Sequence, residues 1–179
     1  LEKIAINKVL ESNFWASGSG GVNVKKFEEK FSKYVNSKSS VAVNSGTSAL
    51  NLALSMYDIK NKEVILPSLS FVATANAVVE NGGIPKFVDI DEKTLCIDPI
   101  KILESISNKT KVILPVHFAG FSSDLTEISK ICKKNKIELI EDAAHSSGAS
   151  YKNRKIGSHG NLVCFSFHPV KNLAMPTGG

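Results

Sequence analysis

The chain has 179 residues, enough for one sizeable hydrophobic core, and its 42% hydrophobic and 22% charged residues are typical of an ordinary globular protein. The formal net charge of +5 is small and the lysines are scattered, so we do not expect a nucleic-acid-binding protein. No apolar run is long enough to span a membrane and no secretory signal is apparent. Three widely spaced cysteines without metal-ligand spacing indicate a reduced, cytoplasmic protein with no metal site.

Residues 1–24 are expected to form an N-terminal lead-in, with a short helix between residues 4 and 10 and a glycine- and serine-rich loop at residues 17–21. Two interpretations of the loop remain open: a plain linker, or a backbone that closely approaches a ligand. Trp15 beside it is either a packing anchor or a wall of a substrate site.

From residue 24 onward, apolar strand-like runs alternate with helical patterns. The strand-like runs lie at residues 41–43, 63–66, 86–88, 112–114, 137–140 and 162–165. The helical patterns cover residues 24–35, 47–57 and 71–80, with two more helices starting after Asp98 and Asp124 as N-caps. This alternation predicts βαβ units and a doubly wound, mostly parallel sheet in a three-layer α/β/α fold. Because residues 146–160 show no helical pattern, the last strand is the candidate for an antiparallel direction.

In such a sheet, ligands bind beyond the carboxyl ends of the strands, so polar residues that directly follow strands are the candidate site residues. The first strand-like run is followed by Asn44-Ser45-Gly46-Thr47-Ser48, a glycine turn that feeds a helix. The unpaired N–H groups of that helix and two hydroxyls suit a phosphate, although a plain helix N-cap uses the same residue types.

The other strand ends carry further candidates. Phe71 could stack on a planar ring or belong to the core, and His117 could face the same crevice or be a core histidine. Asp142 follows a buried run and needs a partner, either a pyridinium nitrogen or a side chain in a salt bridge. Lys171, shortly after Ser166, is a candidate covalent nucleophile or an ordinary surface lysine.

Taken together, these groups describe a site for pyridoxal 5′-phosphate (PLP). The phosphate would lie on the glycine turn with help from Ser166, and the ring would stack on Phe71. Asp142 would keep the ring nitrogen protonated, and Lys171 would bind the aldehyde as a Schiff base.

The chain also resembles the sugar aminotransferases of the DegT/DnrJ/EryC1/StrS family, within the aspartate-aminotransferase-like fold (fold type I). The matching segments run in order along nearly the whole chain, at residues 24–28, 44–50, 66–74, 87–90, 115–117, 141–145, 157–160 and 166–171. The resemblance implies that residues 25–179 form most of the large, PLP-binding domain, with the small C-terminal domain absent from this sequence. Since the chain begins with Leu1 and stops directly after a motif, we expect a fragment of a longer protein.

The resemblance implies a PLP-dependent aminotransferase that moves an amino group from an amino acid, expected to be glutamate, to a nucleotide-linked keto-deoxysugar in polysaccharide or glycoconjugate biosynthesis. Lys171 is the implied catalytic residue. The implied cofactor-binding residues are Gly46, Thr47, Ser48, Phe71, Asp142, His145, Ser166 and Lys171, and substrate contacts are expected from Trp15, Gly20, His117 and His168. Members of the family are dimers that share the active site, so a homodimer is expected.

Two segments depart from the family pattern. His145 stands where the family usually has Gln, and residues 175–179 read Met-Pro-Thr-Gly-Gly where the family often has Gly-Glu-Gly-Gly. Three alternatives remain. The first is PLP-dependent sugar dehydration, against which Lys171 weighs because dehydratase relatives carry histidine there. The second is a nucleotide-binding α/β protein, against which the lack of a GxGxxG or P-loop pattern weighs. The third is a non-catalytic binding module.

Overall fold

The computed structural model describes residues 1–13 and 21–179, so Trp15 and Gly20 lie outside the described residues. The chain divides into two compact units, Leu1–Ala42 and Val43–Gly179. The predicted domain boundary after residue 24 falls inside a helix of the first unit.

The first unit contains two helices, α1 (Glu2–Glu11) and α2 (Gly21–Val35). Both were predicted, with α2 beginning a few residues earlier than its apolar pattern indicates. Glu28 ties the segment after α2 back onto the helix: its carboxylate accepts a hydrogen bond from the Ala42 N–H (2.8 Å), and its carbonyl oxygen accepts one from the Ser40 hydroxyl (2.6 Å).

The second unit is built on a five-stranded sheet in the order β2-β1-β3-β4-β7, in which every neighbouring pair is parallel. The strands are β1 (Glu63–Pro67), β2 (Ile84–Val88), β3 (Thr110–Ile113), β4 (Glu138–Asp142) and β7 (Leu162–Cys164). The parallel sheet predicted from the alternation of elements is therefore confirmed, and the carboxyl ends of its strands lie at one edge.

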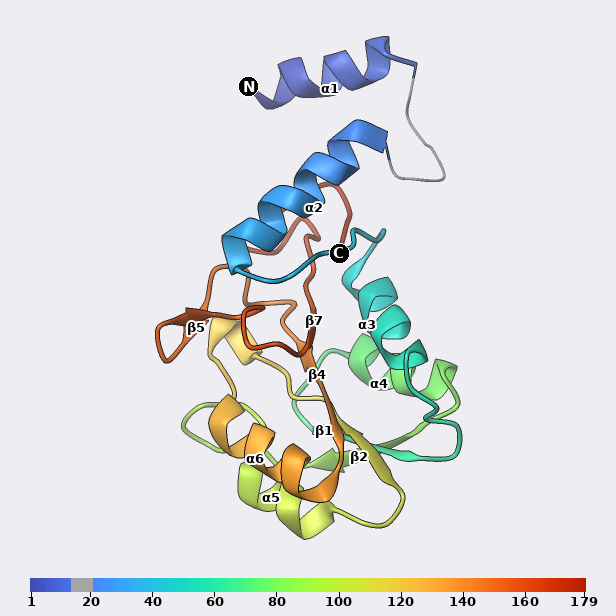
Figure 1. Ribbon diagram of the computed structural model, residues 1–179, viewed down its shortest axis with the longest axis vertical. Helices are drawn as coiled ribbons and strands as arrows, with labels where there is room; N and C mark the ends of the chain where they lie inside the picture. The colour runs from blue at the N-terminus through green and yellow to red at the C-terminus, as the bar shows by residue number, and fades with distance from the viewer. Residues whose placement is uncertain (14–20) are drawn as a thin grey trace. The chain divides into compact units, whose positions relative to one another are not determined.

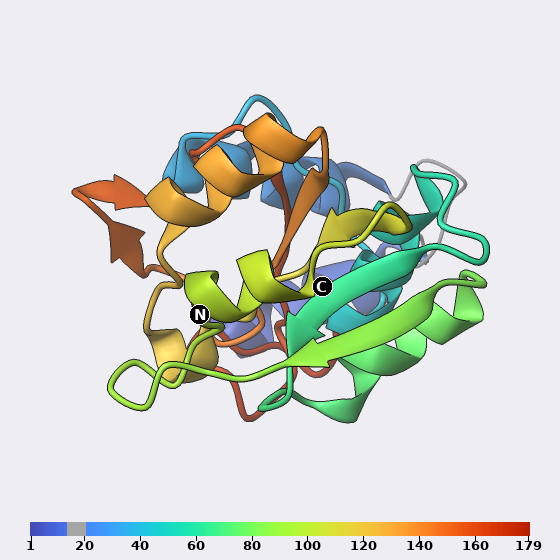
Figure 2. The same cartoon turned by 90° about the horizontal axis from the view of Figure 1, so that it is seen from below.

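Helices cover both faces of this sheet (Figures 1 and 2). They are α3 (Gly46–Ser55), α4 (Val72–Glu80), α5 (Pro99–Ser105) and α6 (Leu125–Asn135), with a short 3₁₀ turn at Phe118–Gly120. Along β1 the side chains alternate between two buried clusters. Val64 and Leu66 join residues of α3 and α4, whereas Ile65 joins residues of α5 and α6. This alternation confirms the three-layer α/β/α arrangement.

Two helix starts follow the predicted capping chemistry. The Asp98 side chain accepts a hydrogen bond from the Ile100 N–H at the start of α5, next to Pro99 in the first turn. The Asp124 carboxylate accepts from the N–H groups of Thr126 and Glu127 at the start of α6 (3.1 Å each).

Two expectations about strands are corrected. The last strand is not antiparallel: β7 pairs in parallel with β4, with Cys164 opposite Asp142. The chain returns to it without a helix, through the small antiparallel hairpin of β5 (Ser150–Tyr151) and β6 (Arg154–Lys155). Residues 41–43 form no strand, because the regular pairing there is limited to hydrogen bonds that Val43 exchanges with Gly179 (3.0 Å each) and a bridge between Ser45 and Gly178.

The cysteines belong to the interior of the second unit. Cys96, Cys132 and Cys164 are buried free thiols, and burial raises the pKa of Cys132 to about 12. These thiols therefore pack as small groups of the interior.

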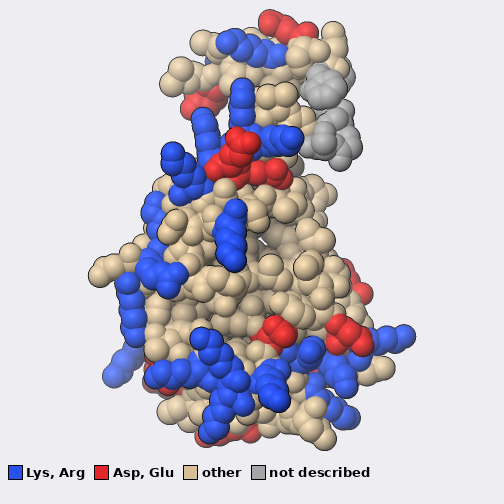
Figure 3. Space-filling view, in the orientation of Figure 1, with Lys and Arg blue, Asp and Glu red and all other residues tan. Residues whose placement is uncertain are grey.

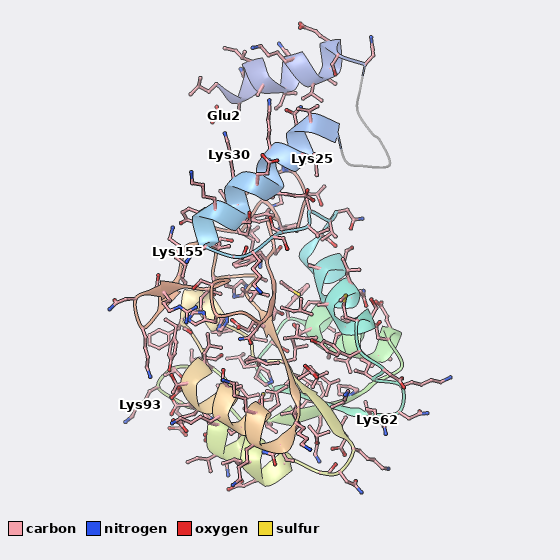
Figure 4. All side chains as sticks on the ribbon, in the orientation of Figure 1. Glu2, Lys25, Lys30, Lys62, Lys93 and Lys155 are labelled. Atoms are coloured by element: carbon pink, nitrogen blue, oxygen red, sulfur yellow. The ribbon has the colours of Figure 1, made fainter. Side chains whose placement is uncertain are left out.

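Charged side chains are spread over the surface of the second unit. Figure 3 shows a group of Lys side chains over α5 and α6, and Figure 4 shows Lys62, Lys93 and Lys155 projecting from the periphery. Within residues 1–13 and 21–179, none of the helices combines the length and the apolar character that a membrane crossing requires.

Candidate active site

A cavity of about 550 Å³ opens at the carboxyl ends of the strands of the second unit. Its size is in the usual range for small-molecule sites. Most of the residues that the sequence predicts for the cofactor line it, together with one predicted substrate contact: Gly46, Thr47, Phe71, Asp142, His145, Ser166, His168 and Lys171. The structure therefore brings together residues that are up to 125 positions apart in the chain, counting from Gly46 to Lys171.

The start of α3 supplies the anion-binding end of the cavity. Ser45 is the N-cap and its hydroxyl accepts a hydrogen bond from the Ser48 N–H (3.1 Å), while Gly46 and Thr47 form the first turn and line the cavity. Free N–H groups and the helix dipole make such an end suitable for a phosphate. The Ser48 hydroxyl is instead hydrogen-bonded to the side chain of Asn44 (2.5 Å), and Ser48 does not line the cavity.

Gly46 packs directly against the segment that follows β7. A Cβ atom at position 46 would stand 2.8 Å from Ser166 Cβ, closer than real Cβ contacts come, and 3.3 Å from the Phe165 carbonyl oxygen, which is a tight contact. The glycine therefore lets the first turn of α3 approach Ser166, a buried residue that lines the same cavity. Both predicted phosphate contacts, the helix start and the Ser166 hydroxyl, lie next to each other.

Asp142 ends β4 with a carboxylate that is almost fully buried, at 5% exposure. Thr74 Oγ1 donates a hydrogen bond to Oδ2 (2.8 Å), and the Ala144 N–H donates one to Oδ1 (3.1 Å). Among the described residues, no cation lies within salt-bridge distance of this carboxylate, so the alternative of an intramolecular salt bridge is not realised. An ionised carboxylate accepts about four hydrogen bonds, so Asp142 keeps capacity for a cationic partner in the cavity.

His145 and Lys171 lie close enough to influence each other. Burial and the positive charge of Lys171 lower the pKa of His145, and the negative charge of Asp142 opposes them. His145 Nδ1 accepts a hydrogen bond from the Ala119 N–H (3.3 Å), and its ring meets Phe118 edge-on at 5.9 Å between centroids.

Lys171 follows a turn that its own N–H closes by donating to the His168 carbonyl oxygen (2.8 Å). Its side chain lines the cavity, and in the described part of the chain it makes no ion pair. An amine without a carboxylate partner is available to react with a ligand.

The remaining predicted residues fall into three groups. Phe71 lines the cavity and is 72% exposed, so the core interpretation does not hold for it. His117 does not line the cavity; its ring is fully buried and its Nε2 lies 2.9 Å from Glu141 Oε2, as expected of a core histidine. Trp15 and Gly20, the other predicted substrate contacts, lie outside the described residues.

Sequence reasoning missed some lining residues. Thr74, 1% exposed, belongs to the Ala- and Val-rich helix α4, and Cys164 lies at the end of β7. A hydroxyl on the buried face of an apolar helix is the signal that would have indicated Thr74, since such a group needs a partner.

A parallel α/β sheet with a lysine, a buried aspartate and a glycine-led helix start at its carboxyl edge defines the class: the large domain of PLP-dependent enzymes of fold type I. The chain belongs to the DegT/DnrJ/EryC1/StrS aminotransferase family, whose family model matches residues 2–179. It is 42% identical over 175 residues to the spore coat polysaccharide biosynthesis protein SpsC of Bacillus subtilis, covering 97% of this chain and 44% of that protein.

Solved structures agree with this assignment. An aminotransferase from Psychrobacter cryohalolentis superposes with a TM-score of 0.94 at 36% identity, covering 99% of this chain and 45% of that one. NtdA from Bacillus subtilis with bound cofactor PMP superposes with a TM-score of 0.87 at 36% identity, covering 97% of this chain and 39% of that one. A mutant of the dehydratase ColD with bound GDP-perosamine superposes with a TM-score of 0.90 at 34% identity, covering 99% of this chain and 47% of that one. The chain thus spans less than half the length of these relatives.

Proposed function

We propose that this chain forms the cofactor-binding part of a PLP-dependent aminotransferase that acts on a nucleotide-linked keto-deoxysugar. The observation that carries the proposal is that Lys171, Asp142 and the start of α3 line one cavity. Family membership and the similarity to NtdA, which holds PMP, support the same conclusion.

The residues of the cavity fit PLP. The close approach of Gly46 to Ser166 leaves backbone N–H groups and a hydroxyl for the phosphate. The exposed ring of Phe71 is available for stacking, and the buried Asp142, which has no cation among the described residues, would hold the protonated ring nitrogen. His145 would pack over the ring, and Lys171 would bind the aldehyde.

When bound, PLP supplies an aldehyde that condenses with amines and a ring that accepts an electron pair. The Lys171 amine would hold the cofactor through its aldehyde and, once the amino donor replaced it there, would take and return the proton at the reacting carbon. Asp142 would keep a proton at the ring nitrogen, and the donors Thr74 and Ala144 fix the direction of its carboxylate. The first turn of α3 would hold the phosphate.

The amino donor is an amino acid, with glutamate the expected one, and the acceptor is the keto group of a nucleotide-linked deoxysugar. The name of SpsC supports a role in polysaccharide biosynthesis. We also propose a homodimer in the cytoplasm. Dehydration of such a sugar is the second candidate, because ColD is similar over nearly the whole chain. By the family resemblance, the lysine at position 171 favours amino transfer.

The first test follows the cofactor on the purified protein. We expect PLP uptake to give a yellow protein, which borohydride bleaches while fixing the label on Lys171, as located by peptide mapping. Lys171→Ala should abolish the fixed label and the transamination. The control is Lys62→Ala, at an exposed lysine on the periphery (Figure 4), which should leave both unchanged.

Label on another lysine, or full turnover by Lys171→Ala, would contradict the assignment. Incubation of the wild-type protein with glutamate and a panel of keto-sugar nucleotides then separates the two candidate reactions. Amino transfer yields an aminated sugar and 2-oxoglutarate, whereas dehydration yields a sugar of lower mass without nitrogen from the donor.

A further inference from the structure

His117 and Glu141 form a buried pair that the proposed mechanism does not use. Both side chains are 0% exposed, and His117 Nε2 lies 2.9 Å from Glu141 Oε2. The pair lies outside the cavity lining, although Glu141 directly precedes Asp142 on β4. Burying a carboxylate is costly unless donors satisfy it, so the pair needs a physical explanation.

The hydrogen bonds around the pair place its protons. The Ser123 N–H donates to His117 Nδ1 (3.1 Å), so Nδ1 is an acceptor and the ring proton sits on Nε2, which donates to Glu141 Oε2. On the other side, Asn161 Nδ2 donates to Glu141 Oε1 (2.6 Å). The Glu141 carboxylate is therefore an acceptor held between two donors from different segments of the chain.

The backbone of His117 connects this pair to Asp142. The His117 N–H donates to the Asp142 carbonyl oxygen (3.0 Å), and the Asp142 N–H donates to the Pro115 carbonyl oxygen (2.9 Å). The His117 carbonyl oxygen accepts from the Ser146 hydroxyl (3.1 Å), just beyond the cavity residue His145. A shift of His117 would therefore move the backbone of Asp142 and, with it, the Asp142 carboxylate.

We infer that His117 and Glu141 are positioning residues for Asp142: through Nε2–H···Oε2 they fix the backbone on both sides of the residue that holds the ring nitrogen. This inference rests on the proposed function, because it concerns the same aspartate. The two acids have different surroundings because neighbouring side chains on β4 point to opposite faces of the sheet. Glu141 is hydrogen-bonded to His117 and Asn161 on one face, and Asp142 lines the cavity on the other.

The test compares four variants of the full chain. Glu141→Ala removes the acceptor and leaves the donors of His117 and Asn161 unpaired. Glu141→Gln is the conservative variant, because its carbonyl can accept from His117 and its amide can donate to a turned Asn161 side chain. Asn161→Ala is a milder perturbation, should Glu141→Ala fail to fold.

The control variant is Glu63→Ala. Glu63 starts β1, at the opposite edge of the sheet from the cavity, and its carboxylate also accepts from several donors, namely Ser107, Thr110 and Lys86. It therefore reproduces the loss of a hydrogen-bonded carboxylate without touching Asp142.

Two readouts are needed. Amide hydrogen exchange at His117 and Asp142 should speed up about tenfold in Glu141→Ala and stay within about threefold of wild type in Glu141→Gln and Glu63→Ala. The rate of the half-reaction with the amino donor should fall at least about tenfold in Glu141→Ala while PLP affinity changes little, because misplaced catalytic groups cost rate rather than binding. Asn161→Ala should give smaller changes in the same directions.

The outcomes separate the inference from the proposed function. Normal PLP uptake with Glu141→Ala behaving like Glu63→Ala would overturn the inference alone. The inference would also be overturned if Glu141→Gln lost as much half-reaction rate as Glu141→Ala without faster amide hydrogen exchange at His117 and Asp142. The charge of Glu141, rather than its hydrogen bonds, would then matter. A wild-type protein that takes up no PLP would remove the proposed function and the inference with it.

Discussion

Adjacent residues of one strand illustrate how environment sets the role of a carboxylate. Glu141 and Asp142 are both buried, at 0% and 5% exposure. Each carboxylate accepts two hydrogen bonds, that of Glu141 from the side chains of His117 and Asn161 and that of Asp142 from the Thr74 hydroxyl and the Ala144 N–H, but only Asp142 lines the cavity. An acid with unused acceptor capacity beside a cavity is the one suited to a cationic ligand group.

At the residue scale, Asp142→Asn should separate structure from chemistry. The amide is isosteric, its oxygen can accept from the Ala144 N–H, and its NH₂ group can donate to the Thr74 hydroxyl, so the free energy of unfolding should change by no more than about 1 kcal/mol. The amide cannot keep the ring nitrogen protonated, so the donor half-reaction should slow by about a hundredfold or more. Denaturant unfolding and stopped-flow absorbance measure the two quantities.

Thr74→Val extends this comparison. This variant keeps the charge of Asp142 and removes one of its hydrogen-bond donors, so the rate of its donor half-reaction should lie between the rates of the wild type and Asp142→Asn. Unchanged half-reaction rates in Asp142→Asn would show that this acid is structural.

At the scale of elements, the site depends on how closely α3 meets the end of β7. The helix starts at Gly46, and its first residue has no side chain to hold it away from Ser166. The helix can therefore aim its N-terminal N–H groups at a point where the Ser166 hydroxyl also lies.

Gly46→Ala tests this contact. Helix propensity alone favours alanine over glycine by up to about 1 kcal/mol. The 2.8 Å approach of the new Cβ to Ser166 Cβ should outweigh that gain, because overpacking costs about 1–3 kcal/mol. We therefore expect a lower free energy of unfolding and weaker PLP binding, measured by denaturant unfolding and by absorbance titration.

The matched control combines Gly46→Ala with Ser166→Gly, which removes the Cβ atom that clashes. This double variant should recover part of the lost free energy of unfolding but not the PLP affinity, since the Ser166 hydroxyl is gone. A Gly46→Ala protein more stable than wild type would show that the helix start is free to move.

At the scale of the whole molecule, local patterns predicted the parallel sheet well because each strand–helix repeat is encoded in neighbouring residues. They failed where the pairing of a segment with a partner far away in the chain decides its structure. A short apolar run at residues 41–43 has no partner that its own pattern specifies, and Val43 pairs instead with Gly179. The direction of β7 depends on a return path through residues 143–161 that contains a hairpin rather than a helix.

The candidate site followed the same rule. Asp142 and Lys171 could be predicted because each follows a run that forms a parallel strand, and parallel strands bring their carboxyl ends together. Gly46 lines the same cavity although residues 41–43 form no strand, because the start of α3 packs against the segment after β7. The Thr74 hydroxyl on Asp142 could not be predicted, since the two residues are 68 positions apart and nothing in the helix pattern ties them together. His117 was expected at the substrate, yet its ring is buried against Glu141, a contact that no local pattern encodes.

The stability of the second unit should also depend on pH through a half-buried histidine, His159. Burial is the largest cause that lowers the pKa of His159 below its ordinary value of 6.5, and its ring packs edge-on against Tyr151 at 6.0 Å between centroids. In the unfolded chain this histidine binds a proton as the pH falls below about 6.5, whereas in the folded protein it stays neutral to lower pH. The unfolded state therefore binds more protons in that window, and the free energy of unfolding should fall as the pH is lowered from about 6.5 toward the folded pKa.

His159→Gln removes this titration. Near pH 8 the histidine is neutral in both states, so the free energies of unfolding of wild type and variant should run parallel with pH there, which serves as the internal control. Below about pH 6.5 the wild type should lose stability more steeply than the variant, as followed by urea unfolding at a series of pH values. Burial also contributes to the lowered pKa of His145, so the variant should keep part of the acid sensitivity. Equal slopes below pH 6.5 would show that His159 is as easily protonated in the folded protein as in the unfolded chain, and that its partial burial beside Tyr151 costs the charged form nothing.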